Sequence, residues 1–335
     1  MGAESGARQE PRRLRAQTVK ATAATIAAVQ WRDGGIPWEP GGHLDPWNHL
    51  EAAMGLDVAG LRSEAEAAYE WLLRNQRPDG SWAARYRDGR VDLSTMDTNF
   101  TAYVAVGARH HFLRTGDHAW LDRMWPVVDK AVDAVLRRQQ PSGAISWRDD
   151  PEVRLVAGCA SIHHALTQAL ALASARGLDR PQWRVAAHQL RASLLGEPGL
   201  FAAKPHAMDW YYPVLGSVVT GADATERLAA GWDRFVEPGL GVRCVHHEPW
   251  ATGGETAELA LTLATRGDRA RAGELLACLA RLRHDDGSYW TGYQFADKEF
   301  WPDERTTWTS GAVLLATAAL DGDPATCDVF GEHRV

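Results

Sequence analysis

The stretch NQRPDGSW, residues 75–82, is a polar turn that ends in a tryptophan and follows the Ala- and Leu-rich run AEAAYEWLLR. Three related turns also follow helix-like runs: VQWRDGGIPW ends at Trp38, RQQPSGAISW at Trp147 and LRHDDGSYW at Trp290. Similar segments that recur along a chain are the signature of a repeated supersecondary unit. The four turns therefore predict a fold built from repeated units.

Helical periodicity, with cap and breaker residues at the ends, predicts twelve helices. They cover residues 16–30, 47–59, 62–75, 98–115, 118–139, 160–176, 181–195, 209–220, 223–235, 254–266, 268–283 and 307–320. No run of alternating β-branched residues competes with them, and most Gly and Pro residues fall between the helices rather than inside them. We therefore predict an all-α protein.

The predicted helices alternate in character. Those over 62–75 and 118–139 carry charge on one face, as expected of an outer layer. Those over 98–115 and 160–176 are small and apolar nearly all round, as expected of buried helices. Six outer–inner hairpins that close on themselves form an (α/α)6 toroid, which is the fold we predict, and an open α-solenoid is the alternative.

Composition and charge narrow the functional classes. With 45% apolar and 24% charged residues, the chain resembles a globular domain. We expect a disordered polar tail over 1–14 and a single toroid domain over 15–335. A net charge of −7 argues against a nucleic-acid partner. Apolar stretches long enough to span a bilayer and the apolar core of a secretory signal are both missing from the sequence, so we expect a cytoplasmic protein without a membrane partner.

The tryptophans of the repeated turns have a structural explanation. Gly80 suits a left-handed backbone position, Asp79 suits a turn hydrogen bond, and Trp82 can fold back between hairpins as a buried anchor. We expect Trp82, Trp147 and Trp290 to fasten the repeats to one another, a role that needs no ligand.

Five acidic residues lie at the starts of predicted inner helices: Asp45, Asp97, Asp209, Glu255 and Glu304. The inner helices of antiparallel hairpins in a ring all run the same way, so we expect these acids at one common mouth. Each acid also has a structural explanation. Asp45 followed by Pro46 fits a helix N-cap, and Asp97 and Asp209 can cap as well.

Aromatic residues accompany the acids, namely Trp47, Phe100, Trp210, Tyr211, Tyr212, Trp250, Trp301 and Trp308. Aromatic faces pack against the apolar faces of sugar rings, and carboxylates accept hydrogen bonds from hydroxyl groups, so the combination predicts a carbohydrate ligand. Glycoside hydrolysis needs one carboxylic acid at the leaving oxygen and one carboxylate that acts through water or as a nucleophile. The predicted mouth supplies both.

Other chemistries have little support in the sequence. The histidine pairs at 110–111, 163–164 and 246–247 are adjacent, so on a helix their side chains diverge by about 100°. The sequence contains no HExxH, GxSxG, Walker or GxGxxG motif. Its four cysteines are far apart and predict neither disulfides nor a thiolate zinc site. We predict no metal and no cofactor.

The segment QRPDGSW matches the QxxDGSW consensus of squalene and hopene cyclases and related prenyltransferase-type toroids. The DxDD acid motif of those cyclases is absent, since residues 92–97 read DLSTMD, and so is the DDxxD motif that binds magnesium in prenyl transfer. This resemblance supports an α/α toroid and argues against terpene chemistry.

A second resemblance covers nearly the whole chain after residue 20. The segments GGHLDPWNHLEAAMGLD, DTNFTAYVAVGARHHFL, SIHHAL, MDWYYPVLG, GLGVRCVHHEPW, GSYWTGYQF and WPDERTTWTSGAV resemble a group of actinobacterial six-hairpin glycosidases, often labelled prenyltransferase-like. Within that group the resemblance implies a hydrolase of cytosolic methylmannose polysaccharide, an endo-α-(1→4)-mannosidase. Toroidal glycosidases of the glucoamylase type imply inversion, with one acid from an early hairpin and one from a late hairpin.

We predict Asp45 as the catalytic acid and Glu255 as the base. The predicted substrate-binding residues are Trp47, His49, Glu51, Asp97, Asn99, His163, Asp209, Trp210, Tyr211, Trp250, Glu258, Trp290 and Glu304. Five of them are also rival candidates for the catalytic acids, namely Glu51, Asp97, Asp209, Glu258 and Glu304. Two alternatives remain. A sugar epimerase on the same toroid would use a pair of histidines from among His49, His111, His163 and His164, and a non-catalytic toroid would only bind carbohydrate or protein.

Overall fold

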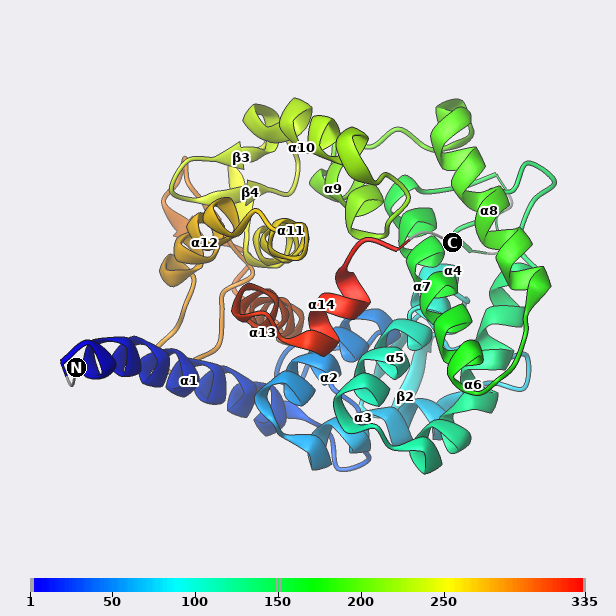
Figure 1. Ribbon diagram of the computed structural model, residues 1–335, viewed down its shortest axis with the longest axis horizontal. Coiled ribbons are helices and arrows are strands. Elements are labelled where there is room, and N and C mark those ends of the chain that lie inside the picture. The colour runs from blue at the N-terminus through cyan, green and yellow to red at the C-terminus, as the bar shows by residue number, and fades with distance from the viewer. Residues whose placement is uncertain (1–2, 149, 151, 334–335) are drawn as a thin grey trace.

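Two concentric layers of helices make up the computed structural model, which describes residues 3–148, 150 and 152–333 (Figure 1). The outer helices are α1 (Ala3–Val29), α3 (Arg62–Asn75), α6 (His118–Leu136), α8 (Pro181–Gly196), α10 (Gly221–Phe235) and α12 (Arg269–Cys278). The inner helices are α2 (Pro46–Ala59), α4 (Thr98–Ala102) with its continuation α5 (Val104–Thr115), α7 (Val156–Ala175), α9 (Ala207–Leu215), α11 (Gly253–Thr265) and α13 (Thr307–Asp321). These six outer–inner hairpins confirm the predicted (α/α)6 toroid.

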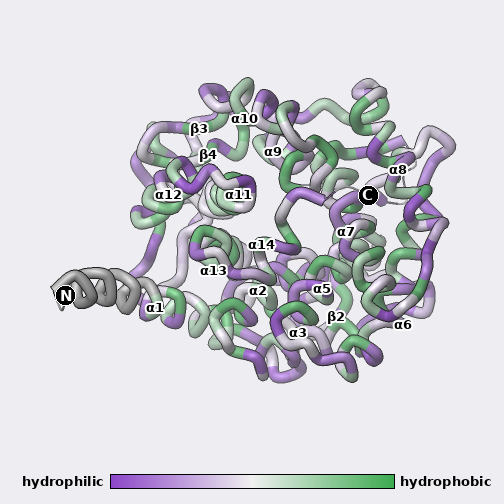
Figure 2. Tube along the Cα trace, in the orientation of Figure 1, coloured by the Kyte–Doolittle hydropathy of each residue, from purple (hydrophilic) through white to green (hydrophobic). Residues whose placement is uncertain are grey.

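The inner helices pack side by side in chain order, and α13 packs against α2 to close the ring. A Cβ added at Gly55 of α2 would lie 3.0 Å from the Cα of Gly311 in α13, so the absence of both side chains permits this close approach. Closure excludes the open solenoid. Hydrophilic residues concentrate at the rim of the molecule, whereas α7, α11 and α13 are mostly hydrophobic or neutral (Figure 2).

In four of the hairpins the repeated turn follows the outer helix and packs against the outer helix of the next hairpin around the ring. Its glycines have φ angles between 87° and 100°, and each glycine packs on the backbone of a neighbouring helix. A Cβ at Gly80 would lie 2.2 Å from the carbonyl oxygen of Lys130 in α6. In the same way Gly34 packs on α3, Gly143 on α8 and Gly287, in the last hairpin, on α1 of the first.

A glutamine reinforces three of these contacts. The side-chain amide of Gln76 donates hydrogen bonds to the carbonyl of Gly80 at 3.0 Å and to the carbonyl of Val127 in α6 at 2.8 Å. Gln30 bonds the carbonyls of Gly34 and of an α3 residue, and Gln139 those of Gly143 and of an α8 residue, in the same way. The same pair of bonds therefore fixes the distance between successive outer helices.

The anchoring position of the turn lies two residues after the glycine. Trp82 occupies it, is 1% exposed, and donates its indole N–H to the carbonyl of Leu72 at 3.0 Å, as predicted. The equivalent buried residues in the other turns are Ile36, Ile145 and Tyr289. The prediction was wrong for Trp147 and Trp290, which lie two and one residues beyond this position and are only half-buried.

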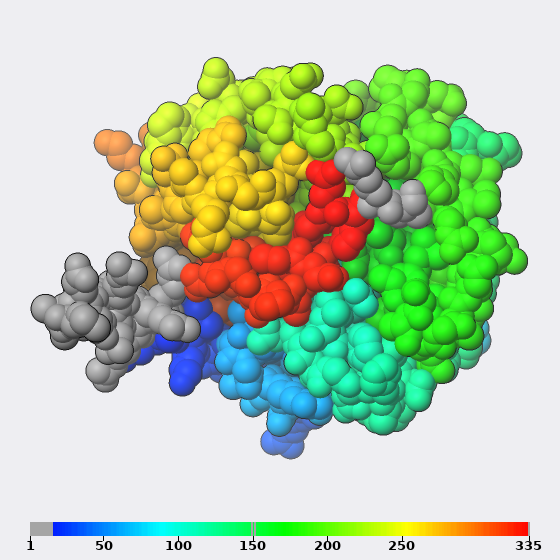
Figure 3. Space-filling view, viewed as in Figure 1, coloured from blue at the N-terminus to red at the C-terminus, as the bar shows by residue number. Residues whose placement is uncertain are grey.

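Helix α14 (Pro324–Phe330) covers one end of the ring, and the segment that contains it, red in Figure 3, fills the middle of that face. Arg114 pairs with Asp323 at 2.7 Å, His110 bonds Thr326 at 3.2 Å, and the Gln168 side chain donates to the carbonyl of Val329. These contacts come from the carboxyl ends of the inner ring. The predicted mouth is at the opposite end.

Long connections at the mouth carry short strands that were not predicted. β1 (Arg85–Arg87) pairs with β2 (Arg90–Leu93), and an antiparallel sheet in chain order contains β3 (Val236–Glu237), β4 (Gly241–Arg243), β5 (Trp250–Thr252), β6 (Gly292–Gln294) and β7 (Glu299–Phe300). Strands of two to four residues are too short to show an alternating pattern. Two short 3-10 helices, η1 (Pro198–Leu200) and η2 (Leu279–Arg281), complete the connections.

Helix α1 starts earlier than residue 16, the predicted start of the first helix. It runs without interruption from Ala3, where a disordered tail over 1–14 was predicted, and residues 1 and 2 lie outside the described part of the chain. Ala, Arg, Gln and Glu in this stretch favour helix, and they continue a helix that buries Ala23 and Ile26. One described helix, α7, is long and apolar enough to cross a membrane, and 67% of its apolar window is buried in the protein.

We predict that Gly80→Ala destabilises the protein more than Gly89→Ala. Both glycines have positive φ, but a Cβ at Gly89 meets nothing within 4 Å. Gly89→Ala should therefore cost only the backbone strain, about 1–2 kcal/mol. Gly80→Ala adds a clash with α6, which should cost about 1–3 kcal/mol more. Urea denaturation of both variants checks this, and equal losses of unfolding free energy would show that the turn does not hold the hairpins together.

Candidate active site

Asp45 and Asp97 are the N-caps of two inner helices, as their positions at the predicted helix starts indicated. The Asp45 Oδ1 atom accepts the backbone N–H groups of Trp47 and Asn48 at 3.1 and 3.0 Å. The Asp97 Oδ1 atom accepts those of Asn99 and Phe100 at 3.0 and 3.2 Å. In both residues the second carboxylate oxygen is not used for capping, so capping does not exhaust what these carboxylates can do.

The second oxygens of these two acids have different partners. The Asp97 Oδ2 atom accepts the indole N–H of Trp147 at 2.5 Å and lies 3.7 Å from Arg148. The Asp45 Oδ2 atom bonds the side-chain amide of Asn48 and lies 3.9 Å from His43. Burial raises the pKa of both carboxyl groups, that of Asp97 to about 6, with the nearby charge of Asp45 as a further cause.

Glu255 lies in the first turn of α11 and is 4% exposed. The hydroxyl of Thr252 donates to its carboxylate, and the thiol of Cys244 lies beside it. Its charge acts on Tyr211 and on Glu258, which is one turn deeper in the same helix. Glu255 is therefore the outermost member of a group of acids that extends into the ring.

Buried side chains from the inner helices of five of the six hairpins form the deep part of this group: Glu51, Tyr103, Tyr211, Tyr212, Glu258 and Trp308. The Tyr103 hydroxyl donates to Glu51 at 3.4 Å. The Tyr211 hydroxyl and the Trp308 indole N–H donate to Glu258, the latter at 3.3 Å. Burial raises the pKa of Glu51 to about 8 and that of Glu258 well above its usual range, where the charge of Glu51 adds to the effect.

Aromatic rings form a continuous wall at the mouth. The Trp47 ring lies 5.4 Å from Tyr103 and 6.0 Å from Trp308, and Trp38 stacks on Trp308 at 5.7 Å and on His43 at 5.9 Å. The buried polar atoms beside the capping acids that have no hydrogen-bond partner include the indole nitrogen of Trp47 and the amide oxygens of Asn48 and Asn99. They are free to bond the hydroxyl groups of a ligand.

Three predicted substrate-binding residues face the space between the two layers instead of the mouth. His49 accepts from the backbone of Ile36 and bonds the carbonyl of Ala68 in α3, both at 3.0 Å. Trp210 donates to the carbonyl of Arg227 in α10, and His163 bonds the carbonyl of Gly216. Burial lowers the pKa of both histidines to about 4. These contacts assign all three residues to packing. A small rotation along a helix decides whether a side chain faces the mouth or the outer layer.

Four other predicted residues lie near the N-terminal ends of inner helices but outside the deep group. Asp209, in the first turn of α9, accepts the backbone N–H of Ala157 at 3.0 Å and so joins α9 to the start of α7. Trp250 lies on β5 and donates its indole N–H to the backbone of Trp301. Trp290 and Glu304 line a separate cavity beside α1.

The histidines that supported an epimerase do not meet at the mouth. His111 pairs with Asp57 at 2.9 Å, near the carboxyl end of α2. His164 packs edge-on against Phe330 of α14, at the closed end of the ring. His49 and His163 face other layers, as described above. Among the described residues, no three His, Cys, Asp or Glu side chains are grouped as metal ligands would be.

Sequence reasoning overlooked several residues of the site. His43 and Trp38 precede α2 in a connection, and Trp147 was expected to be a buried anchor. Tyr103 interrupts the inner helix between α4 and α5, and as the one tyrosine in the run TNFTAYVAVGA it was a signal that could have been used.

Comparison with known proteins adds a sequence relation to this geometry. The chain matches no family model. It is 48% identical, over 312 residues, to the MMP endo-(1,4)-3-O-methyl-alpha-D-mannosidase of Mycolicibacterium hassiacum, and the match covers 92% of this chain and 87% of that protein.

Solved structures share the fold at low sequence identity. A wild-type glycosidase superimposes with a TM-score of 0.74 at 19% identity, over 91% of this chain and 96% of its own. A D-mannose isomerase superimposes with a TM-score of 0.71 at 11% identity, over the same shares of the two chains. Since the toroid occurs in both kinds of enzyme, the fold alone does not decide the reaction.

We predict that Glu51→Gln flattens the dependence of stability on pH. The folded protein keeps Glu51 protonated up to about pH 8, whereas an unfolded Glu ionises near 4.5, so the folded state binds more protons in this window. Wild-type stability should fall as the pH rises from 5 to 8, by at most about 1.4 kcal/mol per pH unit from this group. In Glu51→Gln, the unfolding free energy should lose this contribution to its dependence on pH.

Urea denaturation at pH 5 and pH 8 measures the effect, with Glu226→Gln, an exposed position on α10, as the control. An identical pH dependence in the wild type and in Glu51→Gln would contradict the assignment of a buried, protonated carboxyl group.

Proposed function

The chain belongs to the family of glycoside hydrolases that includes the MMP endo-(1,4)-3-O-methyl-alpha-D-mannosidase, and on that premise we propose that it cleaves a methylmannose polysaccharide at internal α-(1→4) linkages. The identity of 48% over 92% of the chain is the observation that carries this proposal. The site supports it, because unpartnered polar atoms, buried carboxylates and aromatic rings meet at the mouth of the ring.

Asp45 is the general acid in this proposal. A general acid must hold its proton near the working pH, which requires a raised pKa. Burial raises the pKa of Asp45, and His43 and Asn48 beside it act in the opposite direction. The free indole N–H of Trp47 and amide oxygen of Asn48 flank the carboxyl group, where they can orient the sugar whose glycosidic oxygen Asp45 protonates.

Glu255 is the general base that activates water. Thr252 and Cys244 hold its carboxylate at the start of α11. Helices α11 and α2 both pack on α13, so Glu255 and Asp45 belong to helices on the two sides of Trp308. Because α13 stands between them, α2 and α11 do not pack on each other, and this arrangement favours the wider carboxylate separation that leaves room for a water molecule. We therefore propose an inverting mechanism without a cofactor.

The aromatic wall suits a methylated sugar. O-methyl groups add apolar surface to a sugar, and the rings of Trp38, Trp47 and Trp308 offer apolar faces at the mouth. The substrate we propose is a cytoplasmic polymer. The cytoplasmic location itself is a proposal that cell fractionation tests.

We predict that Asp45→Asn and Glu255→Gln each lower turnover by at least about 10²-fold, because each removes a proton-transfer group. Folding should change little, since Asn is as good an N-cap as Asp. Hydrolysis of a methylmannose oligosaccharide, followed by mass spectrometry, measures turnover, and Glu226→Gln, which replaces an exposed carboxylate of the outer helix α10, serves as the control. Near-normal turnover in either variant would show that the replaced residue is not catalytic, and Asp97 or Glu258 would then be the candidate for that role.

We also predict that the product forms with inverted configuration. The carboxyl groups of an inverting pair stand about 6.5–9.5 Å apart, against about 5–5.5 Å for a retaining pair. NMR of the newly formed reducing end, recorded before mutarotation, should show the β anomer first. An initial α anomer would indicate a retaining enzyme and a different catalytic pair.

A further inference from the structure

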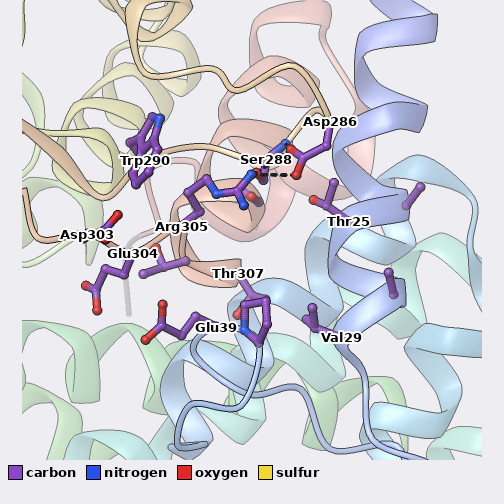
Figure 4. A pocket seen from close by; sticks show the side chains of 15 residues that line it. Thr25, Val29, Glu39, Asp286, Ser288, Trp290, Asp303, Glu304, Arg305 and Thr307 are labelled. Atoms are coloured by element: carbon purple, nitrogen blue, oxygen red, sulfur yellow. Dashed lines mark hydrogen bonds and ion pairs between the residues drawn. The ribbon is translucent and has the colours of Figure 1, made fainter. Parts of the chain in front are cut away.

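A second cavity of about 550 Å³ lies beside the mouth, between α1 and the segment that leads into α13 (Figure 4). Thr25 and Val29 of α1 line one side, and Trp290 and Thr307 line the other. Its volume lies within the range of sites for small ligands. None of the catalytic residues proposed above lines it.

The two ends of this cavity differ in charge. Glu39, Asp303 and Glu304 gather at one end, and Arg305 reaches towards Asp286 at the other (Figure 4). Arg305 donates to Asp286 at 2.6 Å, which fixes the guanidinium group. Burial raises the pKa of Glu39, and the charges of Glu304 and Asp303 contribute. The described acids are not grouped as metal ligands, so the cavity offers hydrogen-bond acceptors rather than a cation site.

Aromatic rings continue the cavity towards solvent. Trp290 stacks on Phe300 at 5.2 Å with an interplanar angle of 9°, and the next residue, Trp301, packs edge-on against Trp250. Phe300 and Trp301 are 41% and 55% exposed and, within the described residues, are the large aromatic side chains with high exposure. Phe300 and Trp301 are consecutive residues whose rings contact Trp290 and Trp250, and their exposed faces favour contact with an apolar surface over contact with water.

The cavity and the mouth share one wall. Glu39 in the cavity follows Trp38, whose ring belongs to the mouth. Thr307, on the cavity side, donates its backbone N–H to the carbonyl of Trp38 at 2.8 Å. A chain of sugars that leaves the mouth over Trp38 would therefore enter this cavity directly.

We propose that the cavity and the Phe300–Trp301 pair, together called the side cleft, bind sugar residues of the polysaccharide beyond the point of cleavage. The proposal rests on the proposed function and extends it to a second binding site. The carboxylates of Glu39 and Glu304 accept hydrogen bonds from sugar hydroxyls. The faces of Trp290 and Trp301 pack against the O-methylated, apolar faces of the sugar rings. The side cleft thereby favours long polymers over short oligosaccharides.

Binding tests the side cleft separately from catalysis. Isothermal titration of the Asp45→Asn protein, in which turnover is disabled, gives Kd for a long methylmannose polysaccharide and for a short methylmannose oligosaccharide. Trp290→Ala and Trp301→Ala are then introduced one at a time. Trp301 is exposed, so its replacement leaves the fold intact even if Trp290→Ala does not. Val185→Ala, an equally exposed apolar position on α8, is the matched control.

We expect each tryptophan variant to raise Kd for the long polymer by about 10-fold, which corresponds to the loss of one good contact. Kd for the short oligosaccharide and all values for Val185→Ala should stay the same. Equal effects on long and short ligands, no effect in Trp301→Ala, or no binding of the long polymer at all would overturn the proposal. Hydrolysis by the wild-type protein is assayed in parallel, and its absence would refute the proposed function but not the side cleft.

Discussion

The hairpins are held at their spacing by the contact between the glycine of the repeated turn and the backbone of the next outer helix. Gly80 has no Cβ, so its turn can approach α6 until backbone meets backbone. The same contact recurs after α1, α6 and α12, and the last of these returns to α1. It therefore sets both the spacing of the hairpins and the point at which the ring closes.

Closure gives the inner helices a common direction, and the site follows from that. Their first turns meet at the mouth, where Asp45 and Asp97 cap helices with one carboxylate oxygen and contact side chains of the site, Asn48 and Trp147, with the other. Deeper in the ring, Glu51 and Glu258 are buried among tyrosine hydroxyls, and burial keeps their pKa values high. α14 covers the other end of the ring, so the open side is the one that carries the acids (Figure 3).

The sequence predicted features that depend on local patterns and missed those that depend on the neighbouring helix. Turn repeats and apolar periodicity were enough to predict the toroid and to place the acids at the helix starts. The directions of His49 and Trp210 were not predictable, because each lies a residue or two from Glu51 or Tyr211, and one residue turns a helix by about 100°. The short strands and α14 form through long-range contacts, and their local sequences carry little signal.

In the mechanism that we propose, Asp45 and Glu255 act on the two sides of one glycosidic bond. The sharpest test of this pair is a crystal structure of the Asp45→Asn protein with a methylmannose oligosaccharide bound across the mouth. We expect the glycosidic oxygen within hydrogen-bonding distance of residue 45, about 2.6–3.2 Å, and a water molecule between Glu255 and the anomeric carbon. A glycosidic oxygen bonded instead to Asp97 or Glu258, or a sugar placed too close to Glu255 to admit water, would contradict it.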